Sequence, residues 1–208
     1  MELPDIQLET RLWKEGYSYV FGLDEVGRGP LAGPVVAACV CITNKEQVID
    51  GVRDSKKISE KNRIILNELI IEKSTAYGIG VVSEKEIDQL NIRQATKLAM
   101  IRAIQYANEK FNIIPDYLIA DGGINLIENY NMLSINKGDV MHYSISAASI
   151  IAKVYRDNIM KEYSIKYPEY GFDKHVGYGT KQHIDAIYKY GVLDIHRKTF
   201  APISKLVV

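Results

Sequence analysis

The sequence contains little cysteine, and its cysteines do not form a metal-binding motif. Cys39 and Cys41 are the two present in 208 residues, and they alternate within an apolar stretch that predicts a strand. Neighbours at this spacing are poor disulfide partners, so we expect two reduced, buried thiols in a cytoplasmic protein. The four histidines are well separated along the chain, so the sequence shows no zinc-binding spacing.

Long apolar runs and an excess of charge of one sign are also absent. No run approaches the roughly 20 apolar residues that a membrane-spanning helix needs, so we expect no contact with membranes. The first five residues, MELPD, contain neither a basic nor an apolar segment, which argues against a signal peptide. Basic and acidic residues balance at 26 each, so any basic surface for nucleic acid must be local.

The chain does contain alternating apolar strands and helices. Strands are predicted over about residues 19–21, 35–42, 76–82, 117–121 and 131–135. Helices are predicted to follow Ser59, Ser83 and Asn91, and to cover about residues 144–166 and 180–190. We therefore expect an α/β fold, with a mixed sheet covered by helices. The length fits a single domain over residues 1–208, with about residues 160–208 as a helical C-terminal extension.

The most informative stretch joins the first two predicted strands. Asp24 and Glu25 end the first strand, and Arg28 follows between Gly27 and Gly29. Neighbouring strand residues point to opposite faces, so two adjacent acids cannot serve one site from a regular strand. Glycines allow the chain to bend where the acids end. A polar hairpin turn is the simpler interpretation, but an arginine between two glycines also suits a phosphate-binding loop.

Two further acids follow later strands. Asp121 ends an apolar strand and precedes a glycine, and Asp139 lies in a predicted strand-to-loop exit at residues 137–140. Either acid alone could be a turn or cap residue. Together with Asp24 and Glu25 they form an oxygen-only set that suits Mg²⁺ or Mn²⁺. Two such ions could activate a water and stabilise the leaving oxygen in phosphodiester cleavage.

The predicted helix at residues 144–166 has an apolar face and a narrower polar stripe. We expect its core face to comprise Ile145, Ala148, Ala152, Tyr155 and Ile159. The polar stripe comprises Ser146, Ser149, Lys153 and Arg156 or Asp157. A solvated face with a Lys153–Asp157 pair is the simple interpretation, and we expect it for Arg156 and Asp157. The serines could instead present hydroxyls to a phosphate.

Basic residues gather in two places, although solvated surface is the default interpretation of both. The first cluster comprises Arg53, Lys56, Lys57, Lys61 and Arg63. The second, in the tail, comprises Lys174, Lys181, Lys189, Arg197, Lys198 and Lys205. On a nuclease both could follow phosphates. Tyr178 lies between two glycines before a predicted helix, where it could cap that helix or stack on a sugar or base.

Taken in order, these motifs resemble ribonuclease HII, the bacterial type 2 ribonuclease H. The matching segments are DEVGRGPLAG at residues 24–33, DSKK at 54–57, DG at 121–122, KGD at 137–139, SAASIIAKVYRD at 146–157, GY at 177–178 and HRKTF at 196–200. They run in the family's order over about residues 20–202, so the resemblance covers nearly the whole chain. An ordered set of this kind is far more specific than a single Asp-Glu pair.

The resemblance implies an RNase H-like fold, with a central mixed five-stranded sheet and flanking helices. It also implies cleavage of the RNA strand of RNA–DNA hybrids and at single ribonucleotides embedded in duplex DNA, leaving 5′-phosphate and 3′-hydroxyl ends. The family's four metal-site carboxylates fall on Asp24, Glu25, Asp121 and Asp139. Its ribonucleotide-reading loop falls on Gly27, Arg28 and Gly29, and its junction tyrosine on Tyr178. Lys56 and Ser149 fall near positions associated with phosphate contact.

Some features depart from the family or remain open. Many relatives have a small polar residue in place of His142, and the roles of His142 and Asp157 are not assigned. The tail at residues 204–208 lacks the paired aromatics of the sliding-clamp peptide of archaeal relatives, so we expect a monomer without a protein partner. The related type 3 enzyme would need an N-terminal domain, for which residues 1–23 leave no room. A hybrid-binding module without catalysis is the other alternative, and the four acids argue against it.

Overall fold

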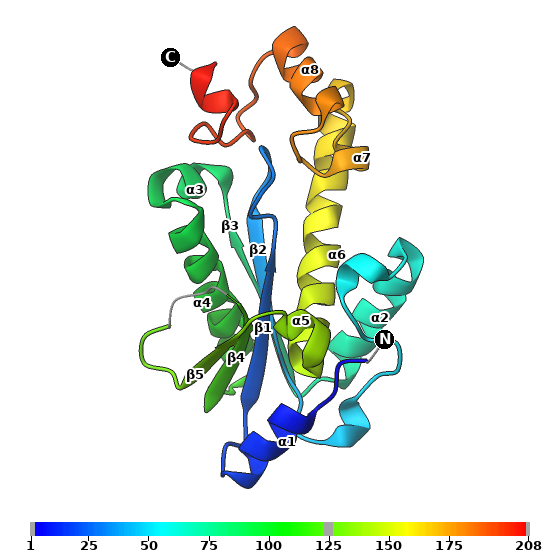
Figure 1. The fold of residues 1–208 in the computed structure, drawn as a ribbon, viewed down its shortest axis with the longest axis vertical. Helices are drawn as coiled ribbons and strands as arrows, with labels where there is room; N and C mark the ends of the chain where they lie inside the picture. Colours follow the sequence, from blue (N-terminus) through cyan, green and yellow to red (C-terminus); the bar gives the residue numbers. More distant parts are fainter. Residues whose placement is uncertain (1–2, 123–126, 207–208) are drawn as a thin grey trace.

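The polypeptide is built around one mixed β-sheet (Figure 1). The computed structural model describes residues 3–122 and 127–206, and within them five strands pair in the order β3-β2-β1-β4-β5. The strands are β1 (Val20–Val26), β2 (Val35–Cys41), β3 (Ala76–Val82), β4 (Tyr117–Asp121) and β5 (Met132–Ile135). β2 runs antiparallel to β1 and β3, whereas β4 runs parallel to β1 and β5. The predicted mixed five-stranded sheet is confirmed.

Helices cover both faces of the sheet, with α4 on one side and α6 and α2 on the other (Figure 1). The described helices are α1 (Gln7–Lys14), α2 (Glu60–Lys73), α3 (Glu84–Leu90), α4 (Ile92–Phe111), α5 (Gly138–Met141), α6 (Tyr143–Lys166), α7 (Phe172–His175) and α8 (Lys181–Tyr190). Ser59 and Ser83 cap α2 and α3 by accepting backbone N–H groups, as predicted.

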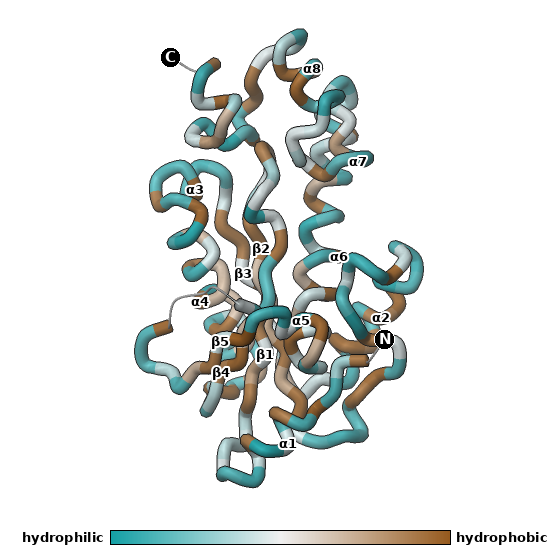
Figure 2. The backbone as a smooth tube through the Cα atoms, in the orientation of Figure 1, coloured by the Kyte–Doolittle hydropathy of each residue, from teal (hydrophilic) through white to brown (hydrophobic). Residues whose placement is uncertain are grey.

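Small residues in the strands let both helix layers approach the sheet closely. A methyl group on Gly80 of β3 would lie 1.9 Å from the Ala99 carbonyl oxygen of α4. On the opposite face, a methyl group on Gly22 of β1 would lie 2.4 Å from Ser144 of α6. Apolar residues are concentrated along the strands (Figure 2). Buried residues of α4 pack against one face of the sheet and those of α6 and α2 against the other, which gives a close-packed core on each face.

The core face of α6 was predicted correctly only over its first half. Ile145, Ala148 and Ala152 are buried, but Tyr155 is 42% exposed and Arg156 is fully buried. The predictions of a core Tyr155 and a solvated Arg156 are therefore wrong. α6 extends beyond the sheet (Figure 1), and past residue 152 it packs against the C-terminal part instead. Its buried side there passes through Arg156 and Met160, one residue round the helix from the predicted face.

The C-terminal part packs around a separate apolar cluster at the far end of α6. That cluster contains Leu31, Met160, Phe172, Ile187 and Ile203, so it also includes the segment that follows β1. Backbone hydrogen bonds pair residues 31–33 with residues 195–197, from Gly33 N–H to Ile195 O and from Arg197 N–H to Leu31 O. Within the described ranges, no helix is long and apolar enough to cross a membrane.

Candidate active site

Parallel pairing of β1 and β4 brings Asp24 and Asp121 together. Leu23 lies opposite Ala120 in this pair, so the next residues along, Asp24 and Asp121, are level and share a face of the sheet. β4 ends at Asp121, so both acids lie at the carboxyl end of parallel strands, where ligands commonly bind in α/β folds. Asp24 is only 6% exposed, and the nearby Ser149 hydroxyl of α6 favours the charged form of its carboxylate.

A third acid, Asp139, reaches this region from α5. The segment at residues 137–140 was predicted as a strand-to-loop exit, but it forms the turn into α5 and the helix itself. Gly138 N–H donates to Asp121 Oδ1 at 2.7 Å, which holds the first turn of α5 against the end of β4. Ser146 Oγ donates to the Asp139 carbonyl oxygen at 2.6 Å and so ties that turn to α6. Asp139 is thus delivered by a helical turn that is fixed on two sides.

Glu25 lies next to Asp24 on β1, so alternation starts its side chain on the other face, yet its carboxylate is close enough to interact with those of Asp24 and Asp121. The pairing of β1 with β2 continues unbroken to Val26, and the chain turns only at Gly27, where φ is +91°. The glycine turn therefore follows the acids and leaves their strand regular. Arg28 Nη1 donates to Glu25 Oε1 at 3.0 Å, and Glu25 Oε2 is buried with no hydrogen-bond partner among the described residues.

The four acids interact electrostatically. Burial raises the pKa of Asp24 well above its usual value, and the charges of Glu25 and Asp121 raise it further. Burial also raises the pKa of Glu25; the ion pair with Arg28 opposes this rise, and the charge of Asp121 adds to it. The pKa of Asp139 is raised by burial and then by Asp121. The charge of Asp121 therefore raises the pKa of each of the other three acids.

Neighbouring carboxylates suit a divalent cation, because its charge offsets the repulsion between them. The donors are carboxylate oxygens, which Mg²⁺ and Mn²⁺ prefer, and the unpartnered Oε2 of Glu25 is a buried acceptor that a cation would satisfy. In the part of the chain that the structure describes, no three His, Cys, Asp or Glu side chains lie close enough as placed to hold an ion. The residues fit a magnesium or manganese site by chemistry.

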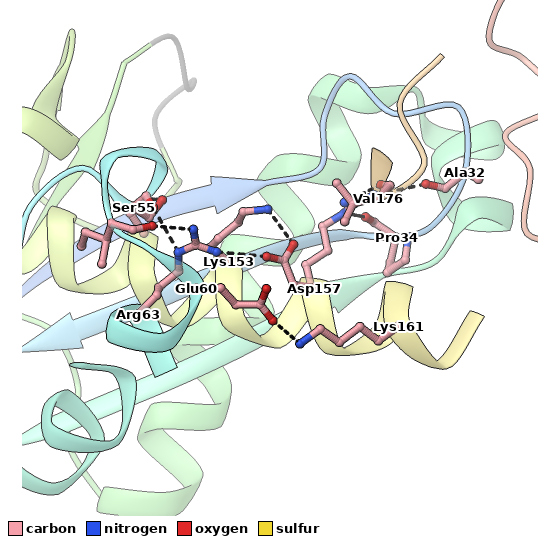
Figure 3. Close-up of polar contacts among 12 residues, drawn as sticks. Ala32, Pro34, Ser55, Glu60, Arg63, Lys153, Asp157, Lys161 and Val176 are labelled. Carbon is pink, nitrogen blue, oxygen red and sulfur yellow. Dashed lines mark hydrogen bonds and ion pairs between the residues drawn. The ribbon is translucent and has the colours of Figure 1, made fainter. Parts of the chain in front are cut away.

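Two buried arginines hold the glycine loop that follows β1. Arg197 donates through its guanidinium to the carbonyl oxygens of Gly27, Arg28 and Gly33, at 2.5–3.0 Å. Arg156 donates to the carbonyl oxygens of residues 32, 34 and 176, at 2.9–3.1 Å (Figure 3). Each guanidinium satisfies several carbonyls from one rigid plane. The loop's shape is therefore set by side chains that are distant in sequence.

Tyr178 lies against this loop. A methyl group on Gly29 would lie 3.4 Å from Tyr178 Cε1, and the tyrosine side chain is about half exposed. The adjacent Gly177 accepts a hydrogen bond from Leu31 N–H at 2.8 Å. Thr180, not Tyr178, caps α8, because its side chain accepts from a backbone N–H of the first turn. Tyr178 is thus free to present its ring beside the glycine loop.

A second loop, at residues 54–58, is held by α6 and α2. Ser55 Oγ lies 2.9 Å from Ser149 Oγ, so the hydroxyl that favours the charged form of Asp24 also holds this loop. Arg63 of α2 donates to the carbonyl oxygens of Ser55 and Ile58 and to Asp157 of α6 (Figure 3). Asp157 is therefore a partly buried anchor for the loop, and the prediction that it is simply solvated is wrong.

Lys56 is exposed on this second loop, and its positive charge acts on the acids. Its ammonium is one of the charges that lower the pKa of Asp139, against the larger effects of burial and of neighbouring acids. Lys153 Nζ donates to Asp157 Oδ1 at 2.6 Å, as the spacing predicted. The acids are therefore flanked by an exposed lysine on one loop and an exposed tyrosine on the other.

The sequence matches the profile of the family Ribonuclease HII over residues 21–203. The chain belongs to the ribonuclease HII family. Among its relatives, the ribonuclease HII of Bacillus cytotoxicus is 54% identical over 199 residues, which cover 96% of this chain and 74% of that protein. The crystal structure of the ribonuclease H2 from Pyrococcus horikoshii OT3 is similar with a TM-score of 0.76 and 28% identity, covering 90% of this chain and 96% of that one.

These matches confirm the RNase H-like fold and the class of activity. As a member of the ribonuclease HII family, the protein is a ribonuclease H, a nuclease that hydrolyses the RNA of RNA–DNA hybrids. The crystal structure of Bst-RNase HIII in complex with Mn²⁺ shares the fold, with a TM-score of 0.67 and 18% identity over 92% of this chain and 70% of that chain.

Sequence reasoning missed the two arginines that hold the glycine loop of this ribonuclease. Arg197 was assigned to a solvated basic tail, and it is fully buried. For Arg156 a signal was available, because it lies four residues after Ala152 and four before Met160, both buried. For Arg197 no local pattern distinguishes a buried arginine from an exposed one, since its partners lie more than 160 residues earlier.

Proposed function

We propose that this ribonuclease cuts both at long RNA–DNA hybrids and at single ribonucleotides embedded in duplex DNA, using two divalent ions. The observation that carries the proposal is the register of β1 and β4, which sets Asp24 level with Asp121 where Asp139 also arrives. Acids from three segments lie near this point, and the charge of Asp121 raises the pKa of both Asp24 and Asp139. A divalent cation offsets this repulsion, so the arrangement favours binding one.

The acids would divide between two ions. Asp24 and Asp139 would hold one, and Asp24, Glu25 and Asp121 the other. When bound, such a pair supplies an activated water and stabilises the charge on the leaving 3′-oxygen, which gives 5′-phosphate and 3′-hydroxyl ends. The chain's own part is to hold these carboxylates: the Gly138 N–H orients Asp121, and the Arg28 guanidinium orients Glu25.

The glycine loop would recognise the 2′-hydroxyl of the ribonucleotide. Arg197 occupies the carbonyl oxygens of Gly27 and Arg28, whereas the N–H groups of Arg28 and Gly29 donate to no other group in the described ranges. Those donors remain available to a hydroxyl, the group that distinguishes RNA from DNA at a given site. Because a deoxyribose would leave them unpaired, such a contact discriminates strongly.

Tyr178 would stack at the junction where RNA gives way to DNA. Its half-exposed ring lies beside Gly29, so a sugar that reaches the glycine loop would meet the ring. Base or sugar stacking on an aromatic ring is worth about 1–3 kcal/mol by alanine substitution. Lys56, with Ser149 behind its loop, would neutralise a backbone phosphate on the other side of the acids.

The proposal places this activity in a single domain, acting as a cytoplasmic monomer. Two observations support parts of it. The C-terminal part pairs by backbone hydrogen bonds with the loop after β1, so residues of both build the site. Cys39 and Cys41 are buried and unbridged, as reduced thiols in the cytoplasm would be.

A cleavage assay tests the proposal. Wild type and Asp121→Asn are each incubated with duplex DNA that contains one ribonucleotide and with a long RNA–DNA hybrid, in Mg²⁺ or Mn²⁺. We expect the wild type to cut both substrates and the variant to lose at least a hundredfold on both, since Asp121 is shared by the other acids. Glu109→Gln, which neutralises an exposed acid on α4, is the matched control.

Three results would contradict the proposal. If wild type left the single-ribonucleotide substrate intact while cutting the hybrid, the broader substrate range would be wrong. If Asp121→Asn cut as fast as wild type, the carboxylate mechanism would be wrong. A wild type that bound both substrates without cutting either would be a binding module.

A further inference from the structure

Three histidines from separate segments stack in a row behind the Tyr178 loop. The His175 and His183 ring centroids are 4.6 Å apart, and those of His183 and His196 are 5.2 Å apart. All three are buried, with His183 fully enclosed and His196 at 1% exposure. The proposed function uses none of these rings, so their buried polar nitrogens need a separate explanation.

The hydrogen-bond partners of these rings dictate where each proton sits. Leu193 N–H donates to His196 Nδ1 at 2.7 Å, so the proton of a neutral His196 must be on Nε2. His196 Nε2 lies 3.0 Å from His183 Nε2, which must therefore accept, and this leaves the His183 proton on Nδ1. His183 Nδ1 then donates to the carbonyl oxygen of Tyr178 at 2.9 Å. The chain of donors runs one way, from Leu193 to Tyr178.

Tyr178 is the residue on which this chain ends. Its carbonyl oxygen also accepts from Thr180 N–H at 2.8 Å, and its own N–H donates to the His175 carbonyl oxygen at 2.9 Å. The backbone of Tyr178 is thereby fixed on both sides, while its ring remains half exposed beside Gly29. What the histidines restrain is therefore the placement of the tyrosine ring.

We propose that His183 and His196 are positioning residues for Tyr178, and that their neutral, directional pair sets how well the enzyme recognises a single ribonucleotide. This inference rests on the proposed junction role of Tyr178. The histidines touch no substrate, and they act only by holding the Tyr178 carbonyl. Loss of the pair would loosen the ring, so recognition of an isolated ribonucleotide would suffer more than cleavage within a long hybrid.

The surroundings of the pair keep both rings neutral. The ionisable groups packed against them are His175, stacked on His183, and Tyr170, whose ring lies 5.6 Å from His196. In the described part of the chain neither ring hydrogen-bonds a carboxylate. A further proton on His183 would set two N–H groups head to head across the 3.0 Å contact, and one on His196 Nδ1 would face the Leu193 N–H, so neither would have an acceptor. Burial accordingly lowers the pKa of each ring to about 4.

Histidine tautomers can be read directly by long-range ¹H–¹⁵N correlation spectra of the ¹⁵N-labelled protein at pH 7. We expect His183 as the neutral Nδ1–H tautomer and His196 as the neutral Nε2–H tautomer. His183→Leu and His196→Leu assign the signals. A His183 protonated on Nε2 alone would overturn the proposal, because it could not donate to Tyr178. A charged His183 would overturn it as well, because its Nε2–H would face the Nε2–H of His196 and the directional pair would not exist.

Cleavage rates then test whether the pair acts through Tyr178. The readout is the ratio of kcat/KM on the single-ribonucleotide duplex to that on the long hybrid. We expect His183→Leu and Tyr178→Ala to lower this ratio by similar factors, on the order of ten to a hundred. His183→Asn should restore most of it, because the amide nitrogen replaces the Nδ1 donor. In a Tyr178→Ala background, His183→Leu should change the ratio by less than about twofold.

A stability control and two contrary outcomes complete the test. Met100→Ala leaves a cavity in the apolar cluster between α4 and the sheet, a cluster that contains none of the three histidines, and should lower Tm without changing the ratio. If Tyr178→Ala lowers the ratio and His183→Leu does not, the positioning role is overturned and the junction role stands. If Tyr178→Ala itself leaves the ratio unchanged, the junction role fails, and the positioning proposal fails with it.

Discussion

Replacing Arg197 with methionine should destabilise the protein and slow cleavage together. The guanidinium donates to the carbonyl oxygens of Gly27, Arg28 and Gly33, and its side chain is fully buried. Methionine fills similar volume but donates nothing, so three carbonyl oxygens lose their donor. The loop that they belong to is the one proposed to recognise the ribonucleotide.

The magnitude follows from counting those oxygens. A buried acceptor left without its donor costs about 1–3 kcal/mol, so three cost at least about 3 kcal/mol. For a protein of about 200 residues, 1 kcal/mol shifts Tm by roughly 2–4 °C, which predicts a fall of about 6–12 °C. A loop displaced by about 1 Å can lose up to about a hundredfold in rate, so we expect kcat/KM on the single-ribonucleotide duplex to fall at least tenfold.

Thermal unfolding and cleavage are measured on wild type, Arg197→Met and Arg197→Lys. Lysine keeps the charge but donates from one point, so it cannot span the three carbonyls and should fall between the other two proteins. Lys198→Met, at the exposed neighbouring position, is the control and should leave both quantities near wild type. If Arg197→Met changed Tm by less than about 2 °C and left kcat/KM intact, the loop would not depend on this arginine.

Three further predictions concern the same region. Gly27→Ala should unfold or inactivate the protein, because φ at Gly27 is +91° and the added methyl would lie 2.2 Å from Arg156 Nε. Gly29→Ala should fold normally and lose only single-ribonucleotide cleavage. Equal Tm values for the two variants would contradict this prediction. Because the pKa of His183 is lowered to about 4 from its ordinary value of 6.5, the unfolded chain takes up a proton at this residue first as the pH falls. The contribution of His183 to stability should therefore fall by about 1.4 kcal/mol per pH unit between about pH 6.5 and 4, and His183→Leu should remove this part of the slope and leave the part due to His196, in urea titrations at each pH. Asp157→Asn should weaken the anchoring of residues 54–58, so amide hydrogen exchange should be faster in this loop while the rate in α4 stays the same. Unchanged exchange in the loop would show that Arg63 holds it alone.

The sheet and the main helices could be predicted because their signals are local. Each strand is a short apolar run between turn residues, and Ser59 and Ser83 mark helix starts by a hydroxyl that caps the first turn. Asp24 and Asp121 could be nominated because an acid in a buried strand is costly unless something compensates it, and because ligand sites commonly lie where such strands end. Their convergence could not be derived from spacing, because it depends on which strands become neighbours and in what register.

The contacts that shape the loops were beyond sequence reasoning for the same reason. Arg197 serves carbonyls that are more than 160 residues away, and Arg156 bonds residues on both sides of it in sequence. A buried arginine and a solvated one look alike in a list of residues, since the cost of burial is offset only by partners that the fold supplies. The histidine row shows this as well, because its three members are well separated along the chain and meet only in the C-terminal part.

Titration of Mn²⁺ into the protein by calorimetry at pH 7.5 tests most directly whether the acids of β1, β4 and α5 form one metal site. The account predicts that wild type and Glu109→Gln bind two ions with the same affinity, and that Asp121→Asn loses at least tenfold in affinity for one or both. Heats that are the same for all three proteins would contradict it, because Asp121 would then hold no ion.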